Sequence, residues 1–276
     1  MDTQWKFSRE YNPTTRTIKI TEDIFIGGDT NNTLMIAGPC SIESEKQIEL
    51  VAKMLVKNNI KVLRAGAFKP RTSPYSFFGL GVEGLKLLRK IGDKYNLKII
   101  TEVRDSTQVE DVIAYADIIQ IGAKAMWDYG ILEAVSKTDK PVMIKRAFGA
   151  RVQEVAQIAE FIINGGNENV LICERGIRTF ETGTRFTLDL CGVAWLKEHT
   201  NIPIILDPSH AMGYSYGVAD LTRACTAMGV DGLIIETHPL PEVAKSDASQ
   251  QLNFEQFENM YNSLYPITKA INRNLV

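Results

Sequence analysis

The sequence lacks a long hydrophobic run and an excess of charge of either sign. No apolar stretch approaches the ~18 residues that a membrane span needs, and residues 1–6 do not show the basic-then-apolar order of a signal peptide. The 31 Lys and Arg residues against 33 Asp and Glu residues give a formal charge of −2, so no global attraction to nucleic acid or to an anionic membrane is expected. These absences predict a cytoplasmic protein that binds neither nucleic acid nor membrane.

Cysteine is also scarce. The four cysteines lie far apart and form no Cys-x-x-Cys pair, which argues against a disulfide framework and against a zinc finger. Cys173 lies in an apolar run, whereas Cys191 and Cys225 lie in helical patterns, so all three are predicted to be small buried hydrophobic residues. Cys40 directly follows an apolar run and is considered below with the polar residues.

What the sequence does contain is a regular alternation of apolar runs and helical patterns. Eight runs have the nearly continuous apolar character of parallel strands that are covered on both faces. They are residues 34–37, 61–64, 98–102, 118–121, 142–145, 170–173, 204–207 and 233–236. Helical patterns between them include residues 45–57, 152–163 and 188–198. This alternation predicts the α/β class and a single (β/α)8 TIM barrel rather than a doubly wound sheet.

The chain is expected to divide into an N-terminal extension, residues 1–30, and a catalytic barrel, residues 31–276. The extension holds two strand-like stretches, residues 16–20 and 25–28, which are predicted to pair as a β-hairpin over the barrel floor. The extension is too short to form a separate folded domain.

Polar residues follow every predicted strand, at the end where this fold builds its active site. In strand order they are Cys40; Arg64, Lys69 and Arg71; Glu102; Lys124; Lys145 and Arg146; Glu174 and Arg175; Asp207 and His210; and Glu236 and His238. One or two such residues would be ordinary core polar groups or helix caps, but a polar group at every strand end favours a functional site.

Cations dominate this set, and their number exceeds what a neutral substrate would require. They are Arg64, Lys69, Arg71, Lys124, Lys145, Arg146 and Arg175. Their convergence predicts ligands that carry several negative charges, as phosphates do.

A second set combines a thiol, an imidazole and two carboxylates: Cys40, His210, Glu236 and Asp247. Strands one, seven and eight are neighbours in a closed barrel, so these donors are expected to meet. Any one of them alone would more often be structural. Together they predict a site for a divalent transition metal of the Mn, Fe, Zn or Co class.

Five motifs give the sequence a resemblance to a known family. They are AGPCSIES at 37–44, AFKPRTSPYSF at 67–77, CERGIRTFE at 173–181, DPSHA at 207–211, and SD at 246–247 with Gln250. In this order they resemble the 3-deoxy-D-arabino-heptulosonate 7-phosphate (DAHP) synthases, in the short type I branch that is related to the 3-deoxy-D-manno-octulosonate 8-phosphate synthases. The resemblance covers about residues 30–255.

The resemblance implies a metal-dependent condensation of phosphoenolpyruvate with erythrose 4-phosphate, which gives DAHP and phosphate in the first step of the shikimate pathway. It also implies a homodimer or homotetramer. The implied metal ligands are Cys40, His210, Glu236 and Asp247. The implied aldehyde-substrate loop is Lys69, Pro70, Arg71, Thr72 and Ser73, and the implied phosphoenolpyruvate contacts are Arg64, Lys145 and Arg175, with Glu102 and Lys124 completing the substrate-binding set. Lys69, Lys145, Asp207 and His210 are the implied catalytic residues.

Cys40 and the loop that begins at Lys69 distinguish this chain within the superfamily. Metal-free octulosonate synthases have Asn in place of the cysteine, and their aldehyde loop has a different sequence. The chain therefore resembles a metal-dependent enzyme that acts on a tetrose.

Some positions depart from the family pattern. Lys124 stands where the family has Arg, which keeps the charge but loses the bidentate fork. Ala65 and Ala147 each replace a usual Gly. These departures favour one alternative, a sister synthase that joins phosphoenolpyruvate to another phosphorylated aldose such as arabinose 5-phosphate. A second alternative, a non-catalytic sugar-phosphate-binding barrel, is disfavoured because the four metal donors and most of the cations are present.

Overall fold

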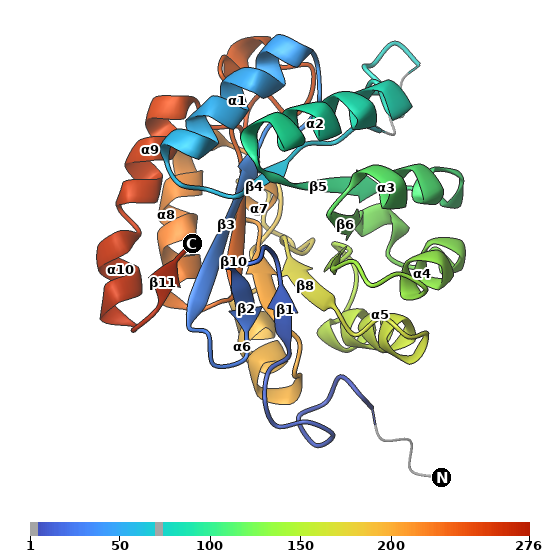
Figure 1. The fold of residues 1–276 in the computed structure, drawn as a ribbon. Helices are drawn as coiled ribbons and strands as arrows, with labels where there is room; N and C mark the ends of the chain where they lie inside the picture. Colours follow the sequence, from blue (N-terminus) through green and yellow to red (C-terminus); the bar gives the residue numbers. More distant parts are fainter. Residues whose placement is uncertain (1–4, 70–73) are drawn as a thin grey trace.

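The computed structural model describes residues 5–69 and 74–276, and within these ranges eight parallel strands form a closed ring (Figure 1). The strands are β3 (Asn32–Gly38), β4 (Val62–Arg64), β5 (Lys98–Val103), β6 (Ile118–Ile121), β7 (Val142–Lys145), β8 (Val170–Glu174), β9 (Ile204–Leu206) and β10 (Gly232–Glu236). Each strand pairs with the next one along the chain. β10 pairs with β3 to close the ring, with Glu236 opposite Gly38. The predicted (β/α)8 barrel is confirmed.

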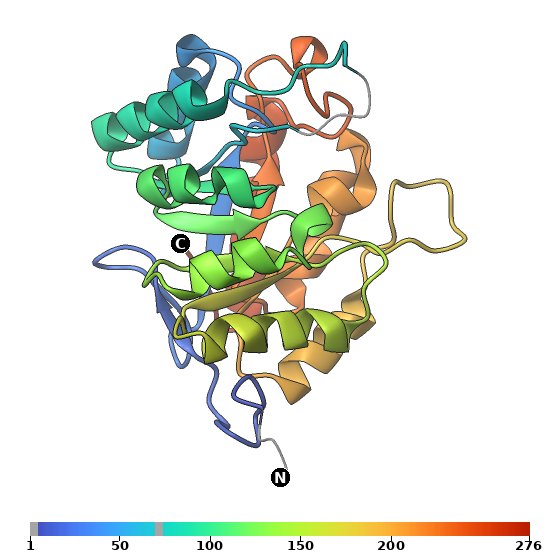
Figure 2. The same ribbon diagram turned by 90° about the vertical axis from the view of Figure 1, so that its right-hand side faces the viewer.

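Helices surround the ring, as Figures 1 and 2 show. They are α1 (Glu45–Lys57), α2 (Gly81–Tyr95), α3 (Val109–Tyr115), α4 (Tyr129–Ser136), α5 (Val152–Asn164), α6 (Leu190–His199), α7 (Pro208–Met212), α8 (Ser215–Ala227), α9 (Phe254–Asn262) and α10 (Tyr265–Ala270). Short 3-10 turns are η1 (Ser106–Gln108), η2 (Ala123–Ala125) and η3 (Pro241–Val243). α6 begins two residues later than the predicted helix at 188–198, because the Asp189 side chain accepts a hydrogen bond from the Gly192 amide and caps it.

The hydrophobic core has two layers. One lies between the strands and the helices, and the other fills the barrel interior. The interior layer includes Ile36, Met143 and Leu171 from three different strands. Such packing makes the interior a core and leaves the cavity for ligands at the carboxyl ends of the strands.

The N-terminal strands β1 (Thr17–Lys19) and β2 (Phe25–Gly27) form an antiparallel hairpin. Ile18 and Ile26 of this hairpin are buried in the interior layer of the core. The hairpin therefore packs against the amino ends of the barrel strands, as the sequence predicted. A further strand, β11 (Asn274–Leu275), pairs with β3 outside the ring.

Two of the three cysteines predicted to be buried are buried, namely Cys173 and Cys225. The prediction for Cys191 is wrong, because this residue is exposed. The cause is the orientation of α6, which turns Val193 and Leu196 toward the core and leaves the Cys191 position facing outward.

Within the described residues, none of the helices has both the length and the apolar character that a membrane crossing requires.

Candidate active site

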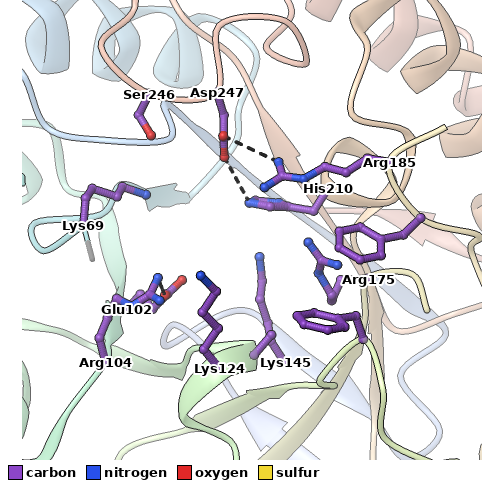
Figure 3. A pocket seen from close by; sticks show the side chains of 13 residues that line it. Lys69, Glu102, Arg104, Lys124, Lys145, Arg175, Arg185, His210, Ser246 and Asp247 are labelled. Carbon is purple, nitrogen blue, oxygen red and sulfur yellow. Dashed lines mark hydrogen bonds and ion pairs between the residues drawn. The ribbon is translucent and has the colours of Figure 1, made fainter. Parts of the chain in front are cut away.

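A cavity opens at the carboxyl ends of the barrel strands (Figure 3). It is lined by Lys69, Glu102, Arg104, Ala123, Lys124, Lys145, Phe148, Arg175, Arg185, Phe186, His210, Ser246 and Asp247. Six of these residues are Lys or Arg and two are carboxylates. The lining therefore carries an excess of positive charge, which favours anionic ligands.

Three of the predicted metal donors lie together beside this cavity. One ligand atom from each of Cys40, Glu236 and Asp247 lies within 4.8 Å of the others. Cys40 follows β3 and Glu236 ends β10, so the pairing that closes the barrel brings them together. Asp247 lies in the loop after η3, and its Oδ2 is 3.4 Å from the Cys40 sulfur.

His210 joins these three donors from α7. Its Nε2 lies 3.5 Å from Glu236 Oε1 and 3.8 Å from Asp247 Oδ2. Its Nδ1 lies 2.8 Å from Asp207 Oδ2. Asp207 is also the N-cap of α7, because its Oδ1 accepts a hydrogen bond from the His210 amide at 3.0 Å. A carboxylate at one ring nitrogen is the arrangement that orients a metal-ligating histidine.

The chemistry of this donor set fits a divalent transition metal. A thiol, an imidazole and two carboxylates combine soft, borderline and hard ligands, whereas Mg²⁺ and Ca²⁺ prefer oxygen alone. Burial raises the pKa of the Cys40 thiol to about 12, and the nearby Glu236 acts in the same direction. A bound cation would instead lower the pKa of this thiol, because coordination stabilises the thiolate.

Glu236 is held in place by several neighbours. Arg64 Nη1 donates to its Oε1 at 2.5 Å, Gln250 Nε2 donates to its Oε2 at 2.6 Å, and its own amide donates to Ser209 Oγ at 3.0 Å. Arg64 is buried, forms an ion pair with Glu236, and is not among the residues that line the cavity. Its predicted contact with phosphoenolpyruvate stays a prediction, and the structure shows it paired with Glu236, a predicted metal donor.

The predicted phosphate-binding cations Lys124, Lys145 and Arg175 line the cavity (Figure 3). Lys145 Nζ donates to Asp207 Oδ2 at 2.5 Å, and both side chains are buried. Arg175 lies over the ring of Phe186, with its guanidinium carbon 4.2 Å from the ring centre. Among the described residues, Arg175 Nη1 has no hydrogen-bond partner although it is buried. A buried, unpaired donor that borders a cavity is suited to bind an anionic ligand.

Lys69 and Glu102 also line the cavity. Lys69 Nζ is 3.0 Å from the Cys40 sulfur, so this ammonium group lies beside the metal donors. Glu102 accepts hydrogen bonds on both oxygens, from Arg104 at 2.5 Å and from Gln120 at 2.6 Å. Pro70, Arg71, Thr72 and Ser73, which the resemblance places in the aldehyde-substrate loop, lie outside the described residues.

Arg146 was expected among the cations of the cavity, and this expectation is wrong. Its side chain is buried and forms ion pairs with Glu174 at 2.9 Å and with Asp189 at 2.8 Å. Its Nε donates to the carbonyl of Ala150 at 2.9 Å. Successive residues of a strand point to opposite faces. Lys145 faces the cavity, and Arg146 therefore points into the layer of helices.

Two cations of the cavity were missed by the sequence reasoning, Arg104 and Arg185. Arg104 lies two residues after Glu102, so strand alternation alone would have placed both on one face. Arg185 lies in the loop between β8 and α6, which projects from the barrel in Figure 2. It donates to Gln250 at 2.8 Å and lies 3.5 Å from Asp247 Oδ1. No local sequence signal indicates that this distant loop folds back over the cavity.

The barrel and its cavity define an enzyme-like (β/α)8 protein in which a set of candidate metal donors adjoins a cationic cavity suited to anionic ligands. The sequence profile of the DAHP synthetase I family matches residues 15–273, and the chain belongs to this family. The membership confirms the predicted family and the predicted enzyme class, a 3-deoxy-7-phosphoheptulonate synthase, which is a transferase that forms a carbon–carbon bond.

Relatives and solved structures agree with this membership. A phospho-2-dehydro-3-deoxyheptonate aldolase from Thermotoga maritima is 42% identical over 264 residues, which are 96% of this chain and 77% of the relative. A 2-dehydro-3-deoxyphosphooctonate aldolase from Fusobacterium nucleatum is 30% identical over 272 residues, which are 92% of this chain and 96% of the relative.

Two solved structures of the Thermotoga maritima DAHP synthase have the same fold. The first matches with a TM-score of 0.93 and 40% identity, and covers 98% of this chain and 78% of that chain. The second, a truncated form, matches with a TM-score of 0.90 and 38% identity, and covers 98% of both chains.

Proposed function

We propose that this chain condenses phosphoenolpyruvate with erythrose 4-phosphate to give DAHP and inorganic phosphate, and that it needs a divalent transition metal for this reaction. The observation that carries the proposal is the set of residues that line one cavity. Lys124, Lys145 and Arg175 line it together with His210 and Asp247, which belong to the metal-donor set. Two anionic substrates and a cation that polarises a carbonyl group match this lining.

The proposed reaction balances without an oxidant or a reductant. C3 of phosphoenolpyruvate attacks the aldehyde carbon of erythrose 4-phosphate, and a carbon–carbon bond forms while the aldehyde oxygen gains a proton. A water molecule then adds at C2 of the former phosphoenolpyruvate. This water releases one proton as it adds, which offsets the proton taken up by the aldehyde oxygen. The bond between C2 and the phosphate oxygen then breaks, and the new C2 hydroxyl passes its proton to the departing phosphate, which leaves a ketone and inorganic phosphate.

Cys40, His210, Glu236 and Asp247 would hold the metal. When bound, the metal supplies Lewis acidity toward the aldehyde carbonyl group. Lys69 lies 3.0 Å from the Cys40 sulfur, so its ammonium group is placed to give a proton to the aldehyde oxygen.

The remaining polar residues bind and orient the substrates. Lys145 and Arg175 would neutralise the charge of phosphoenolpyruvate and hold it in the geometry of attack, together with Lys124 at the exposed side of the cavity. Asp207 contacts both Lys145 and His210, so one carboxylate positions a substrate cation and a metal donor.

The proposal is tested by measuring phosphate release from phosphoenolpyruvate with a panel of phosphorylated aldoses, each with and without a strong chelator. We expect turnover with erythrose 4-phosphate, its loss in chelator, and its recovery when Mn²⁺, Fe²⁺, Zn²⁺ or Co²⁺ is added back. Full turnover in chelator, with metal content verified as negligible, would contradict the metal requirement.

One alternative has a specific observation in its favour. Lys124, which lines this cavity, stands where the family resemblance implies an arginine, and a 2-dehydro-3-deoxyphosphooctonate aldolase is among the relatives. A preference for arabinose 5-phosphate over erythrose 4-phosphate in the same panel would establish this sister activity. No phosphate release with any aldose would instead favour a non-catalytic barrel.

We also infer that the chain forms a homodimer or a homotetramer, as its family resemblance implies. Light scattering coupled to size-exclusion chromatography tests this inference, and a monomer at micromolar concentration would contradict it.

A further inference from the structure

Arg104 lies at the boundary between the main cavity and a second cavity next to it. The second cavity is lined by Phe68, Lys69, Phe78, Arg104, Asp105, Gln108 and Lys124. It shares Lys69, Arg104 and Lys124 with the main cavity. Lys145 and Arg175 line the main cavity alone. Arg104 therefore borders the space in which the proposed phosphoenolpyruvate-binding cations converge.

The Arg104 side chain is held in a fixed direction by Glu102. Its Nη1 donates to Glu102 Oε1 at 2.5 Å, and Glu102 Oε2 accepts from Gln120 Nε2 at 2.6 Å. β5 and β6 are hydrogen-bonded neighbours with Glu102 opposite Gln120. The two hydrogen bonds that Glu102 accepts, called the Glu102 clamp below, are therefore part of the barrel wall. Gly122 allows this clamp, because a Cβ at this position would lie 2.5 Å from Glu102 Oε1.

The Glu102 clamp leaves most of the guanidinium group available for another acceptor. An arginine side chain carries five N–H donors, and the ion pair with Glu102 engages Nη1. Arg104 Nε is buried and has no hydrogen-bond partner within the part of the chain that the structure describes. Leaving a buried charged donor unpaired is costly, so a site of this kind is suited to an anionic ligand.

Because residue 124 is a lysine, a guanidinium group from a nearby residue would add a bidentate contact that Lys124 cannot make. Its ammonium group is a point charge and cannot bind a phosphate in the bidentate manner of a guanidinium group. Arg104 and Lys124 line both cavities, and Figure 3 shows them and Lys145 extending into the main cavity from the same side.

We propose that Arg104, positioned by Glu102, is a phosphate-binding residue that holds the phosphate of phosphoenolpyruvate together with Lys124. It supplies the guanidinium group that position 124 lacks, from the end of the neighbouring strand. This inference rests on the proposed function for the identity of the substrate.

The first experiment compares Arg104→Met and Arg104→Lys with the wild-type protein in steady-state kinetics. We expect Arg104→Met to raise the KM for phosphoenolpyruvate about 10-fold or more, because one charge-assisted contact to the phosphate is lost. The KM for erythrose 4-phosphate should change less than about twofold. Arg104→Lys should recover part of the loss, because it restores the charge but not the fork.

A matched control is Arg223→Met. Arg223 lies on α8 and forms a surface ion pair with Asp220, and it does not line the main cavity. This variant should keep wild-type values of both KM and kcat. Thermal melts of all variants show whether the fold is retained, and Arg104→Lys keeps the inference testable if Arg104→Met does not fold.

A binding measurement separates this inference from the proposed function. Calorimetry with phosphoenolpyruvate, and with inorganic phosphate as a second probe, needs no turnover. We expect Arg104→Met to weaken the binding of both probes about 10-fold, whether or not erythrose 4-phosphate is the second substrate. Unchanged binding of both, or a rise in KM confined to erythrose 4-phosphate, would overturn the assignment. Failure of the wild-type protein to release phosphate with any aldose would contradict the proposed function instead.

Discussion

At the scale of single residues, Asp207 connects the two halves of the site. Its Oδ2 lies 2.5 Å from Lys145 Nζ and 2.8 Å from His210 Nδ1, and its Oδ1 caps α7. Burial alone would raise the pKa of this carboxyl, but His210 and Lys145 outweigh burial and hold its pKa well below the usual range. Asp207 is therefore ionised and orients His210, a proposed metal donor, together with Lys145, a proposed substrate-binding cation.

Replacing Asp207 tests this double role. Asp207→Asn keeps a good N-cap for α7 but removes the charge that faces His210 and Lys145. We expect metal affinity to fall about 10- to 100-fold, the usual effect of losing a partner that orients a ligand, and the KM for phosphoenolpyruvate to rise. Competition titration with a metal indicator and steady-state kinetics measure the two effects. Wild-type metal affinity would show that His210 is oriented by other contacts.

Lys124 gives a second prediction at this scale. Lys124→Arg should bind phosphoenolpyruvate as well as or better than the wild-type protein, because it restores a planar fork. Lys124→Met should raise the KM for phosphoenolpyruvate on the order of 10-fold or more, with a much smaller change for erythrose 4-phosphate. If Lys124→Met instead weakens mainly the aldehyde substrate, Lys124 lies outside the phosphoenolpyruvate phosphate site.

At the scale of secondary-structure elements, Arg146 connects β7 and β8 with the start of α6. It forms buried ion pairs with Glu174 at the end of β8 and with Asp189, the N-cap of α6. Glu174 in turn accepts a hydrogen bond from the Gly176 amide at 2.6 Å. This network fixes the start of the loop that carries Arg185 over the cavity.

Arg146→Met should therefore be strongly destabilising. The substitution leaves two carboxylates without their cation, and breaking a buried pair in this way typically costs about 3–5 kcal/mol of unfolding free energy. Urea denaturation measures the change, and Arg146→Lys should lose less than Arg146→Met because it keeps the charge. A loss below about 1 kcal/mol for Arg146→Met would mean that water replaces the network readily.

The sequence predicted the elements better than the directions of the side chains at their ends. The helix at 45–57 and the eight strands follow from apolar periodicity, which records burial directly. Periodicity does not indicate the direction in which a polar side chain at a strand end points. Lys145 and Arg146 look equivalent in the sequence, yet only the first lines the cavity. The alternation of strand residues separates them, and it also places Arg104 with Glu102.

At the scale of the whole molecule, the proposed metal donors come from distant parts of the chain. Cys40 and Glu236 meet only because β3 and β10 close the barrel, and Asp247 reaches them from the loop before α9. The motif resemblance named all four donors, and closure explains their meeting. The fold-back of Arg185 depends on contacts with residues about 65 positions away, such as Gln250, and periodicity in the sequence does not record such contacts.

Metal binding should consequently stabilise the entire barrel. A ligand that binds only the folded state at 100 times its dissociation constant adds about 2.7 kcal/mol to the unfolding free energy. We expect Mn²⁺ or Zn²⁺ to raise the melting temperature of chelator-treated protein, and Cys40→Ala to abolish the rise.

The exposed Cys191 provides the matched control, since Cys191→Ala should keep the full shift in melting temperature. An unchanged melting temperature at metal concentrations that restore turnover would contradict coupling between the site and the fold. A shift that persists in Cys40→Ala would place the stabilising metal elsewhere.

Barrel closure through β3 and β10 also sets the earliest point in synthesis at which the proposed metal site can be complete. A nascent chain on the ribosome exposes Cys40 early, but the strand that brings Glu236 opposite Gly38 emerges almost 200 residues later. Until then the thiol has neither carboxylate partner from the cluster beside it. Only a chain translated through Asp247 therefore carries the complete set of proposed metal donors.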